Sequence, residues 1–290
     1  MNRHRSLGSR VFDGFNYFVL VLYAVTTLIP LLYVIGASFS SGAEIAAKGF
    51  VIIPSHPTLA SYEYIFSTSS MKDSLMVSVF ITVVGTAINM LITCLTAYPL
   101  ADKTLPGRKV LMTLITFTLV FSAGMIPSFL LVKALGLYNS LWALMIPGAI
   151  STWNLIVLKN FFQQIPSELA ESATIDGCND VGILFRIILP LSAPALATFS
   201  LFYAVANWNA FFAAIMYISD TKKWPIQVLL RQVIMMSQMI GSNESSATVT
   251  PPSESIKMSV IVIATLPILI VYPFLQKHFV KGVMLGSIKG

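Results

Sequence analysis

The chain has 290 residues, of which 56% are hydrophobic and only 10% are charged, and its formal net charge is +6. Soluble domains contain about 25% charged residues, so this composition excludes an ordinary water-soluble globule and predicts an integral membrane protein. The basic residues flank apolar runs instead of alternating with aromatic residues, which indicates membrane topology and argues against nucleic-acid binding. The two cysteines and three histidines form no cluster with metal-ligand spacing, so no metal site is predicted.

Six apolar runs are long enough to cross a membrane, because a spanning helix needs about 20 residues at a rise of about 1.5 Å each. The sequence therefore predicts an all-α integral membrane protein with six transmembrane helices. We expect these spans near residues 15–38, 76–99, 109–132, 140–158, 192–218 and 258–277.

The distribution of Lys and Arg near the span ends favours both termini inside the cell (N-in, C-in). Eleven such residues then lie on the inner side and seven on the outer side. This arrangement predicts cytoplasmic tails at 1–14 and 281–290, around a membrane domain at 15–280. It also places the polar segment between spans four and five in the cytoplasm. On the outer side it leaves a segment at 44–73, predicted to be partly helical, and a long loop at 220–257.

The polar segment between spans four and five reads PSELAESATIDGCNDVGILFRIILPLSAP and begins at Pro166. Ser167 can cap a short helix whose first turn carries Glu168 and Glu171, where carboxylates suit the positive end of the helix dipole. Apolar residues at helical spacing predict one apolar face on this helix. The residues assigned to that face are Leu169, Ala173 and Ile175.

A sharp turn is expected to follow this short helix. Gly177 comes after Asp176, where the end of a helix favours a residue in the left-handed conformation. A second helix can start at Asn179 or Asp180 and continue towards Pro190. The sequence thus predicts a helix–glycine–helix unit that suits docking of a soluble partner.

Several chemistries have no candidate residues. The chain contains no GxxxxGK[ST] phosphate-binding loop, no HExxH motif and no arrangement of nucleophile and base, so we expect neither an enzyme nor a bound cofactor. The cores of the six expected spans lack Asp, Glu, Lys and Arg, which argues against a proton-driven carrier. Sodium coupling through backbone carbonyls stays open. If the chain transports a solute, its energy is expected to come from another subunit.

The run Glu171-Ser172-Ala173, followed by Gly177 and by Leu189-Pro190, resembles the EAA loop of binding-protein-dependent ABC importer permeases. The family prefers Ala where this chain has Ser172, a change between two small residues. Other runs resemble the carbohydrate-uptake branch, with its MalG-like and LplC/YtcP-type permeases. These runs are Gly124-Met125-Ile126-Pro127, Gly136-Leu137-Tyr138-Asn139, Trp153-Asn154, Trp208-Asn209 and the tail from Gln276 to Gly290.

The resemblance implies a permease subunit in a bacterial cell membrane that imports a carbohydrate, an oligosaccharide by family resemblance, by alternating access. It implies a second homologous permease subunit as heterodimer partner, two cytoplasmic ATPase subunits that bind ATP and Mg, and an extracytoplasmic solute-binding protein. The residues 166–190 then form the loop that couples the permease to the ATPase. Two alternatives remain, a stand-alone secondary transporter or channel for a small polar solute, and a membrane anchor.

The resemblance also implies roles for single residues of the coupling loop. We expect Leu169 and Ala173 to fill an apolar groove on the ATPase, Glu171 to meet a basic or amide donor, and Gly177 to permit the turn. The full predicted set is Glu168, Leu169, Glu171, Ser172, Ala173, Asp176 and Gly177.

Polar and aromatic residues inside the expected spans are candidates for the substrate path, because sugars bind to aromatic faces and amide groups. The same residues can instead join helices, at about 1 kcal/mol for each hydrogen bond. Two of the amides, Asn207 and Asn209, lie about 200° apart on a helix, so we expect one in the path and the other between helices. The candidates are Asn89, Trp153, Asn154, Tyr203, Asn207, Trp208 and Asn209.

The last outer loop and the C-terminal tail each allow two interpretations. The outer loop at 220–257 begins with a helical pattern at 225–239 and ends in a Ser/Asn/Thr-rich tract. That tract suits either contact with the binding protein or plain disorder. The basic tail after Phe279 suits either the ATPase interface or attraction to anionic membrane lipid.

Overall fold

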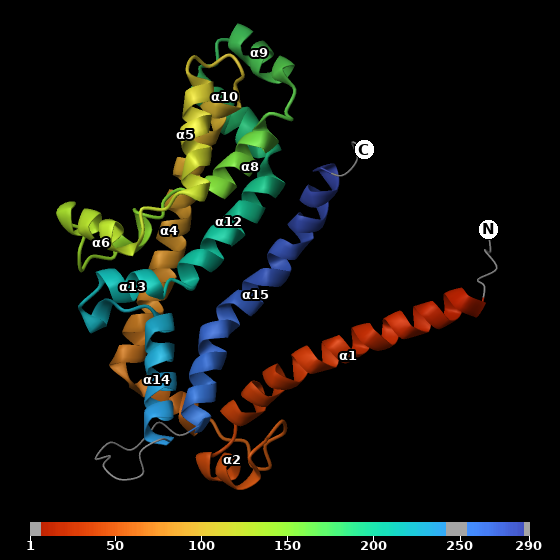
Figure 1. The fold of residues 1–290 in the computed structure, drawn as a ribbon, viewed down its shortest axis with the longest axis vertical. Coiled ribbons are helices and arrows are strands. Elements are labelled where there is room, and N and C mark those ends of the chain that lie inside the picture. Colours follow the sequence, from red (N-terminus) through yellow and green to blue (C-terminus); the bar gives the residue numbers. More distant parts are fainter. Residues whose placement is uncertain (1–6, 242–253, 287–290) are drawn as a thin grey trace. The chain divides into compact units, whose positions relative to one another are not determined.

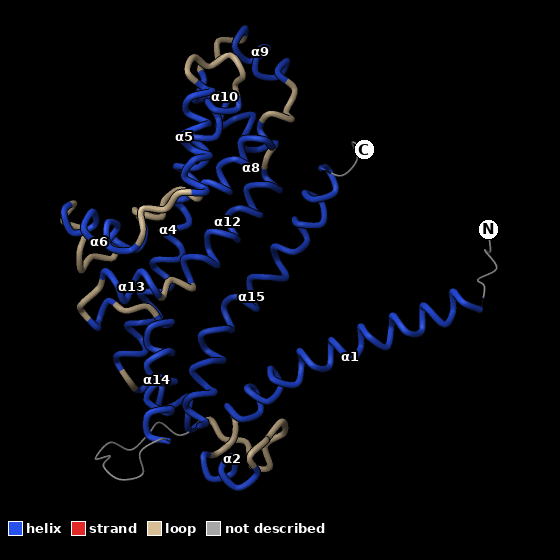
Figure 2. The backbone as a smooth tube through the Cα atoms, viewed as in Figure 1, coloured by secondary structure: helices blue, strands red, loops and turns tan. Residues whose placement is uncertain are grey.

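The computed structural model describes residues 7–241 and 254–286, and all regular secondary structure in these ranges is helical (Figures 1 and 2). The chain divides into two compact units, each made of two segments. The first unit combines the residues up to Thr68 with Leu230–Thr265, and the second combines Ser69–Leu229 with the residues from Leu266 onward. The longer helices are α1 (Leu7–Ser38), α4 (Ser69–Ala101), α5 (Arg108–Val120), α6 (Met125–Ala134), α8 (Thr152–Phe162), α12 (Ala193–Trp208), α14 (Ile226–Gly241) and α15 (Glu254–Gly286).

Short helices connect these longer ones. They are α2 (Gly42–Lys48), α3 (Ala60–Ser67), α7 (Trp142–Met145), α9 (Ser167–Ile175), α10 (Asp180–Ile183), a π-helical turn at Leu184–Ile188, α11 (Leu189–Leu191), α13 (Phe212–Tyr217) and a 3-10 turn at Thr221–Lys223. The helices α2 and α3 confirm that the segment 44–73 is partly helical, and α14 confirms the helical pattern at 225–239.

The second unit is organised around α4, which packs against α7, α8 and α12. Its buried residues recur every three or four positions and so form one stripe along the helix. Several of them are small or polar, which allows neighbouring membrane helices to approach closely. The stripe consists of Ser74, Ser78, Ile81, Gly85, Asn89, Thr93, Ala97 and Leu100.

Three of the expected spans coincide with single helices that are long and apolar enough to cross a membrane. These helices contain the predicted spans at 15–38, 76–99 and 258–277. Prolines inside them, such as Pro30 and Pro99, do not interrupt the helix assignment. This agrees with the tolerance of proline in membrane helices.

The other three expected spans are wrong as continuous helices. The range 109–132 contains α5 and α6, which are bent by 119° relative to each other, and 140–158 contains only the four-residue α7 and then α8. The range 192–218 is interrupted between α12 and α13. By length and apolarity, the described residues provide three spans, or up to five if each bent pair counts as one.

Backbone chemistry explains two of these breaks. Gly124 has a φ of 83° at the start of α6, and Pro147 follows the end of α7, where it offers no N–H to continue the helix. A long run without charges therefore identifies membrane-embedded residues, but it does not distinguish one helix from two half-helices.

In the first unit, a set of polar contacts orders the segment after α1. The Tyr62 hydroxyl and the Ser38 hydroxyl are 2.8 Å apart, and the Ser259 hydroxyl donates to the Ser38 carbonyl at 3.1 Å. The Glu44 carboxylate accepts from the Lys48 ammonium at 2.7 Å and from the Ser55 backbone N–H at 2.8 Å. These contacts, first that of Lys48, lower the pKa of Glu44 from 4.5 to about 2.

Candidate functional site

The predicted coupling loop begins with helix α9. The helix starts at Ser167, and Pro166 precedes it without a side-chain acceptor, so the expected cap by Ser167 is wrong by one position. The fixed φ of proline instead positions the chain for the first helical turn. The Ser172 hydroxyl donates to the Glu168 carbonyl at 2.7 Å, which keeps that side chain on its own helix.

The turn after α9 confirms the prediction made for Gly177. This residue has a φ of 82°, its N–H donates to the Thr174 carbonyl at 3.0 Å, and the Cys178 N–H donates to the Ala173 carbonyl at 2.9 Å. The pair of bonds is a Schellman motif, with Asp176 as the C-cap. A Cβ atom at Gly177 would have no heavy atom within 4 Å, so the left-handed backbone, and not a lack of space for Cβ, is what favours glycine here.

The second helix begins as predicted. The Asn179 side chain accepts from the Gly182 N–H at 2.8 Å and caps α10. Helical structure then continues through the π-helical turn and α11 as far as Leu191. At Ser192 the chain bends by 86° into α12. One nearly continuous helical path thus joins the coupling turn to a helix of the membrane domain.

The apolar residues of α9 do not share one face. Ala173 is 8% exposed and packs into the core of its own chain with Leu100 and Leu155, whereas Leu169 is 43% exposed and Ile175 is 87% exposed. Ala173 and Ile175 are two residues apart, which is about 200° on a helix, so their grouping on one face is wrong. Ile175 is the exposed apolar residue that the predicted coupling set omitted, and the 3.6-residue period alone could have identified it.

The acidic side chains of the coupling loop border a hollow of about 1120 Å³ between α9, α10 and the end of α4. Among its lining residues are four carboxylates and one ammonium group, so its electrostatic potential favours a cationic or donor-rich partner. None of the ion pairs within residues 7–241 and 254–286 includes Glu168 or Glu171. The charged lining residues are Asp102, Lys103, Glu168, Glu171 and Asp180.

Asp102 shows how the edge of this hollow is fixed. Its carboxylate accepts from the Thr104 N–H at 2.8 Å and from the Thr104 hydroxyl at 2.7 Å, and these bonds hold the pKa of Asp102 below its usual value. The Gln163 amide donates to the Ala101 carbonyl at 2.9 Å. Both contacts order the loop that faces α9.

Two of the substrate-path candidates form a buried amide pair between α4 and α12. The Asn89 side chain is 2% exposed and donates to the carbonyls of Gly148 and Ala149, each at 2.9 Å. Its own oxygen accepts from the Asn207 amide at 2.9 Å. A Cβ atom at Gly85 would lie 2.9 Å from that amide nitrogen, so glycine provides the space for this contact.

A third candidate, Tyr203, holds the same region one helical turn away. Its hydroxyl lies 2.8 Å from the Thr93 hydroxyl and accepts from the Ser151 N–H at 3.0 Å. The carbonyls bound by Asn89 and the N–H bound by Tyr203 all belong to the break between α7 and α8. We conclude that Asn89 and Tyr203 hold this break in place by satisfying its backbone groups, and that Asn207 supports Asn89.

The remaining candidates are not gathered into one pocket. Asn154 and Trp208 are buried, at 7% and 4% exposure, whereas Trp153 is 64% exposed. Asn209 is exposed and accepts from the Gln227 amide at 3.3 Å. The expectation that one of Asn207 and Asn209 bonds between helices is confirmed for Asn207, and contact of any of these residues with a substrate stays a prediction.

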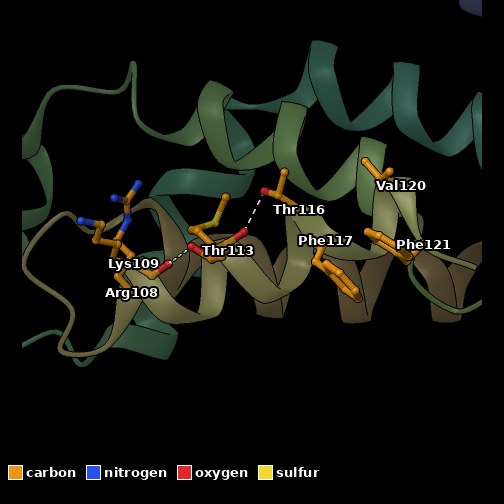
Figure 3. A pocket seen from close by; sticks show the side chains of 8 residues that line it. Arg108, Lys109, Thr113, Thr116, Phe117, Val120 and Phe121 are labelled. Atoms are coloured by element: carbon orange, nitrogen blue, oxygen red, sulfur yellow. Dashed lines mark hydrogen bonds between the residues drawn. The ribbon is translucent and has the colours of Figure 1, made fainter.

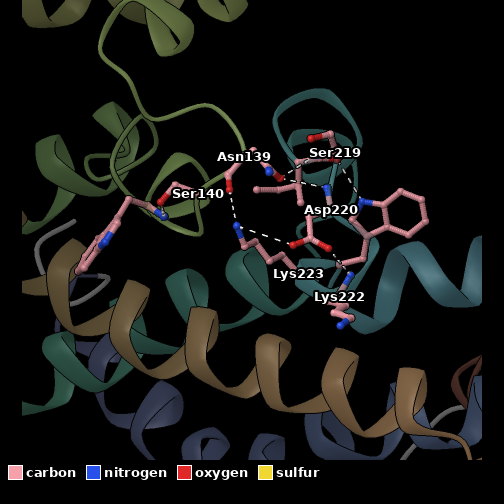
Figure 4. Close-up of polar contacts among 9 residues, drawn as sticks. Asn139, Ser140, Ser219, Asp220, Lys222 and Lys223 are labelled. Carbon is pink, nitrogen blue, oxygen red and sulfur yellow. Dashed lines mark hydrogen bonds and ion pairs between the residues drawn. The ribbon is translucent and has the colours of Figure 1, made fainter.

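A cluster of polar contacts joins the segment after α6 to the segment after α13 (Figure 4). Asn139 has a φ of 59°, and its side-chain oxygen accepts from the N–H groups of Ser219 and Asp220 at 3.2 and 3.0 Å. The Lys223 ammonium donates to the Asn139 carbonyl at 2.9 Å. These contacts fix the start of the predicted outer loop, whose residues 242–253 lie outside the described ranges.

Comparison with known proteins identifies this architecture. Residues 96–285 match the family model of the binding-protein-dependent transport system inner membrane component. The chain is 55% identical over 284 residues to the polygalacturonan/rhamnogalacturonan transport system permease protein YtcP of Bacillus subtilis (strain 168), covering 97% of this chain and 99% of that protein. It is 52% identical over 288 residues to protein LplC of the same organism, covering 99% and 98%.

A solved structure agrees with these relatives. The crystal structure of a bacterial ABC transporter involved in the import of the acidic polysaccharide alginate contains a chain with a TM-score of 0.86 and 31% identity. The similarity covers 96% of the present chain and 100% of that chain.

The chain therefore belongs to the family of binding-protein-dependent transport system inner membrane components, which are multi-pass permease subunits and not enzymes. Within this family its close relatives are the YtcP and LplC permeases, as the runs that begin at Gly124 and Gly136 and the C-terminal tail predicted.

Proposed function

We propose that the chain is one of two permease subunits of a bacterial ATP-driven importer, and that its cargo is an oligosaccharide rich in uronic acid. An extracytoplasmic binding protein delivers this cargo. The observation that carries the proposal is 55% identity, over 97% of the chain, to a permease named for polygalacturonan and rhamnogalacturonan. The structural similarity to an importer of the acidic polysaccharide alginate supports the same class of cargo.

The proposed assembly contains a second homologous permease, two cytoplasmic ATPases that bind ATP and Mg, and surrounding lipid. In it the chain crosses the membrane six times with both termini inside. The helices α1, α4 and α15 each contribute one crossing, each bent pair contributes one, and the segment with α7 and α8 contributes the sixth. The most apolar 18-residue window of α1 has no buried residues within this chain, although Ala37 and Ser38 at the end of the helix are buried, which is compatible with a surface that meets lipid or the second permease. Membership of a binding-protein-dependent family argues against the stand-alone transporter and the membrane anchor.

The proposed mechanism transmits motion of the ATPases through the segment 166–190. A displacement of α9 is passed across the Schellman turn at Gly177 into α10 and α11, and then around the bend at Ser192 into α12. Hydrogen bonds from Asn207 and Tyr203 extend this path to α4 and to the break before α8. The physical support is a contiguous series of short, hydrogen-bonded elements without a flexible linker.

The test uses the complete complex purified with its ATPases, second permease and binding protein. Binding protein loaded with a short galacturonate oligosaccharide should stimulate ATP hydrolysis and uptake into vesicles, and a neutral oligosaccharide of equal length should not. Equal stimulation by both would refute the acidic cargo. Uptake by the chain reconstituted without ATPases would refute the importer and support a stand-alone transporter.

A further inference from the structure

Helix α5 carries a shallow groove of about 720 Å³ along one side (Figure 3). Arg108 and Lys109 stand at one end, and Val120 and Phe121 stand at the other. The two polar side chains between them turn back onto their own helix, since the hydroxyls of Thr113 and Thr116 donate to backbone carbonyls at 2.9 and 2.7 Å. The wall of the groove is therefore apolar along its length, and its charge is confined to one end.

The charged end carries two basic side chains, and the Asp102 carboxylate that the charge of Arg108 influences makes no ion pair with either of them in the described residues. The Arg108 Nε donates to the Leu100 carbonyl at 2.8 Å, which fixes the position of the guanidinium. Lys159 on the adjacent α8 is only 7% exposed, and the charge of Arg108 acts on it. Within the two described ranges, no ion pair includes Arg108, Lys109 or Lys159. Lys109 is exposed, but Arg108 is half-buried and Lys159 is buried, and cations in such positions usually have a close anionic partner. This end of the groove therefore suits an anionic group from outside the chain.

The dimensions of the groove match one leaflet of a bilayer. The 13 residues of α5 extend about 20 Å, and half of a hydrocarbon core is about 15 Å. At the far end the rings of Phe117 and Phe121 stack at 4.2 Å, and the chain then turns by 119° into α6. With Arg108 at the level of the headgroups, a groove of this length would end near the middle of the membrane.

We infer that this groove binds one anionic phospholipid. The phosphate contacts Arg108 and Lys109, and an acyl chain lies against Met112, Thr116 and Val120. Basic sites at the cytoplasmic ends of membrane helices attract anionic headgroups, and an apolar groove of leaflet length accommodates the acyl chain. The phosphate of a zwitterionic lipid is offset by its own ammonium group, so it attracts basic side chains less than an anionic lipid does. An apolar helix of the second permease would offer no anion.

The test measures lipid retention by the complete complex, using native mass spectrometry after exchange into an equimolar mixture of phosphatidylglycerol and phosphatidylcholine. The wild-type complex should retain phosphatidylglycerol. The double variant Arg108→Gln, Lys109→Gln should lose roughly 10-fold or more of this affinity, because each basic residue near the headgroup contributes about 1 kcal/mol. The matched control Lys103→Gln removes a cation from the preceding loop and should retain the lipid.

A second variant separates lipid binding from charge and folding. Val120→Trp fills the apolar end of the groove without changing its charge, at a side chain that is 79% exposed, and should also reduce retention. Equal retention of both lipids by the wild type would overturn the inference. Phosphatidylglycerol retention at the wild-type level in the double variant, or in Val120→Trp, would also overturn it. A photo-crosslinker at Thr116 that captures the second permease and no lipid would equally overturn it. None of these results depends on the cargo or on transport.

Discussion

The turn of the coupling loop depends on the left-handed backbone conformation of Gly177. Its φ of 82° is unfavourable for β-branched residues, although there is open space around a Cβ atom. Gly177→Val should therefore strain the turn by roughly 1–2 kcal/mol without a clash, and Gly177→Asn should be tolerated because Asn adopts this conformation more readily. We expect the Val variant to assemble but to hydrolyse ATP without uptake. Normal uptake by an assembled Val complex would contradict the role of the turn.

Replacement of Asn89 should lower the stability of the folded protein. Asn89→Ala removes the donor to the carbonyls of Gly148 and Ala149, at about 1–3 kcal/mol for a buried polar group. The Asn207 amide keeps its contact with the Thr86 hydroxyl at 3.3 Å. The melting temperature of the purified complex should fall. Asn209→Ala is the matched control, since that exposed residue makes one contact at 3.3 Å. If Asn89→Ala changed cargo preference but left the melting temperature unchanged, a place in the substrate path would be favoured instead.

The Glu44 carboxylate predicts a local dependence on pH. Its pKa is lowered from 4.5 to about 2, so its contribution to stability is complete above pH 4.5 and is lost as the pH falls towards 2. Protection of the Ser55 amide from hydrogen exchange should follow this course, because that N–H donates to Glu44. In Glu44→Gln the protection should no longer change over this range. A wild-type profile that stayed flat down to pH 2 would refute the assignment.

At the scale of the element, the two sides of α9 should respond differently to substitution. Ala173→Leu overpacks the core formed with α4 and α8 and should cost about 1–3 kcal/mol of stability. Ile175→Ser alters an exposed side chain and should leave the melting temperature unchanged while weakening copurification of the ATPases. The reverse pattern would show that Ala173 faces the ATPase.

The turn and the helix starts of the coupling loop were predictable because local chemistry determines them. Gly177 and Asn179 act through bonds to residues within five positions of themselves. The burial of Ala173 was not predictable in the same way, since it depends on α4 and α8, which lie far away in the sequence. The break between α12 and α13 has neither Gly nor Pro to indicate it, so only the packed structure identifies it.

At the scale of the whole molecule, the family could be identified from the spacing between Glu171 and Pro190, whereas the substrate path could not. Polar residues inside membrane helices serve either as hydrogen-bond contacts between helices or as substrate ligands. The residue type alone does not distinguish the two roles. Asn89 and Tyr203 form hydrogen bonds between helices and loops of the chain itself. The exposed Trp153 stays a candidate for contact with the substrate.

The proposed topology makes a prediction for the intact cell. Variants in which Cys94 and Cys178 are replaced by Ala can carry a single new cysteine at an exposed position. A membrane-impermeant thiol reagent should label His56→Cys from outside, and should label Lys103→Cys only after the membrane is opened. The opposite pattern would reverse the orientation derived from the basic residues.

The open space around Gly177 has a stereochemical consequence. What this turn excludes is the handedness of natural amino acids rather than the volume of a side chain. A residue of mirror-image chirality, such as D-alanine, would adopt the same φ without strain and would also restrict the unfolded chain. The joint between the coupling helix and the membrane domain is thus limited by the chirality of its building blocks, since there is space for a Cβ atom of either hand only if the backbone conformation suits it.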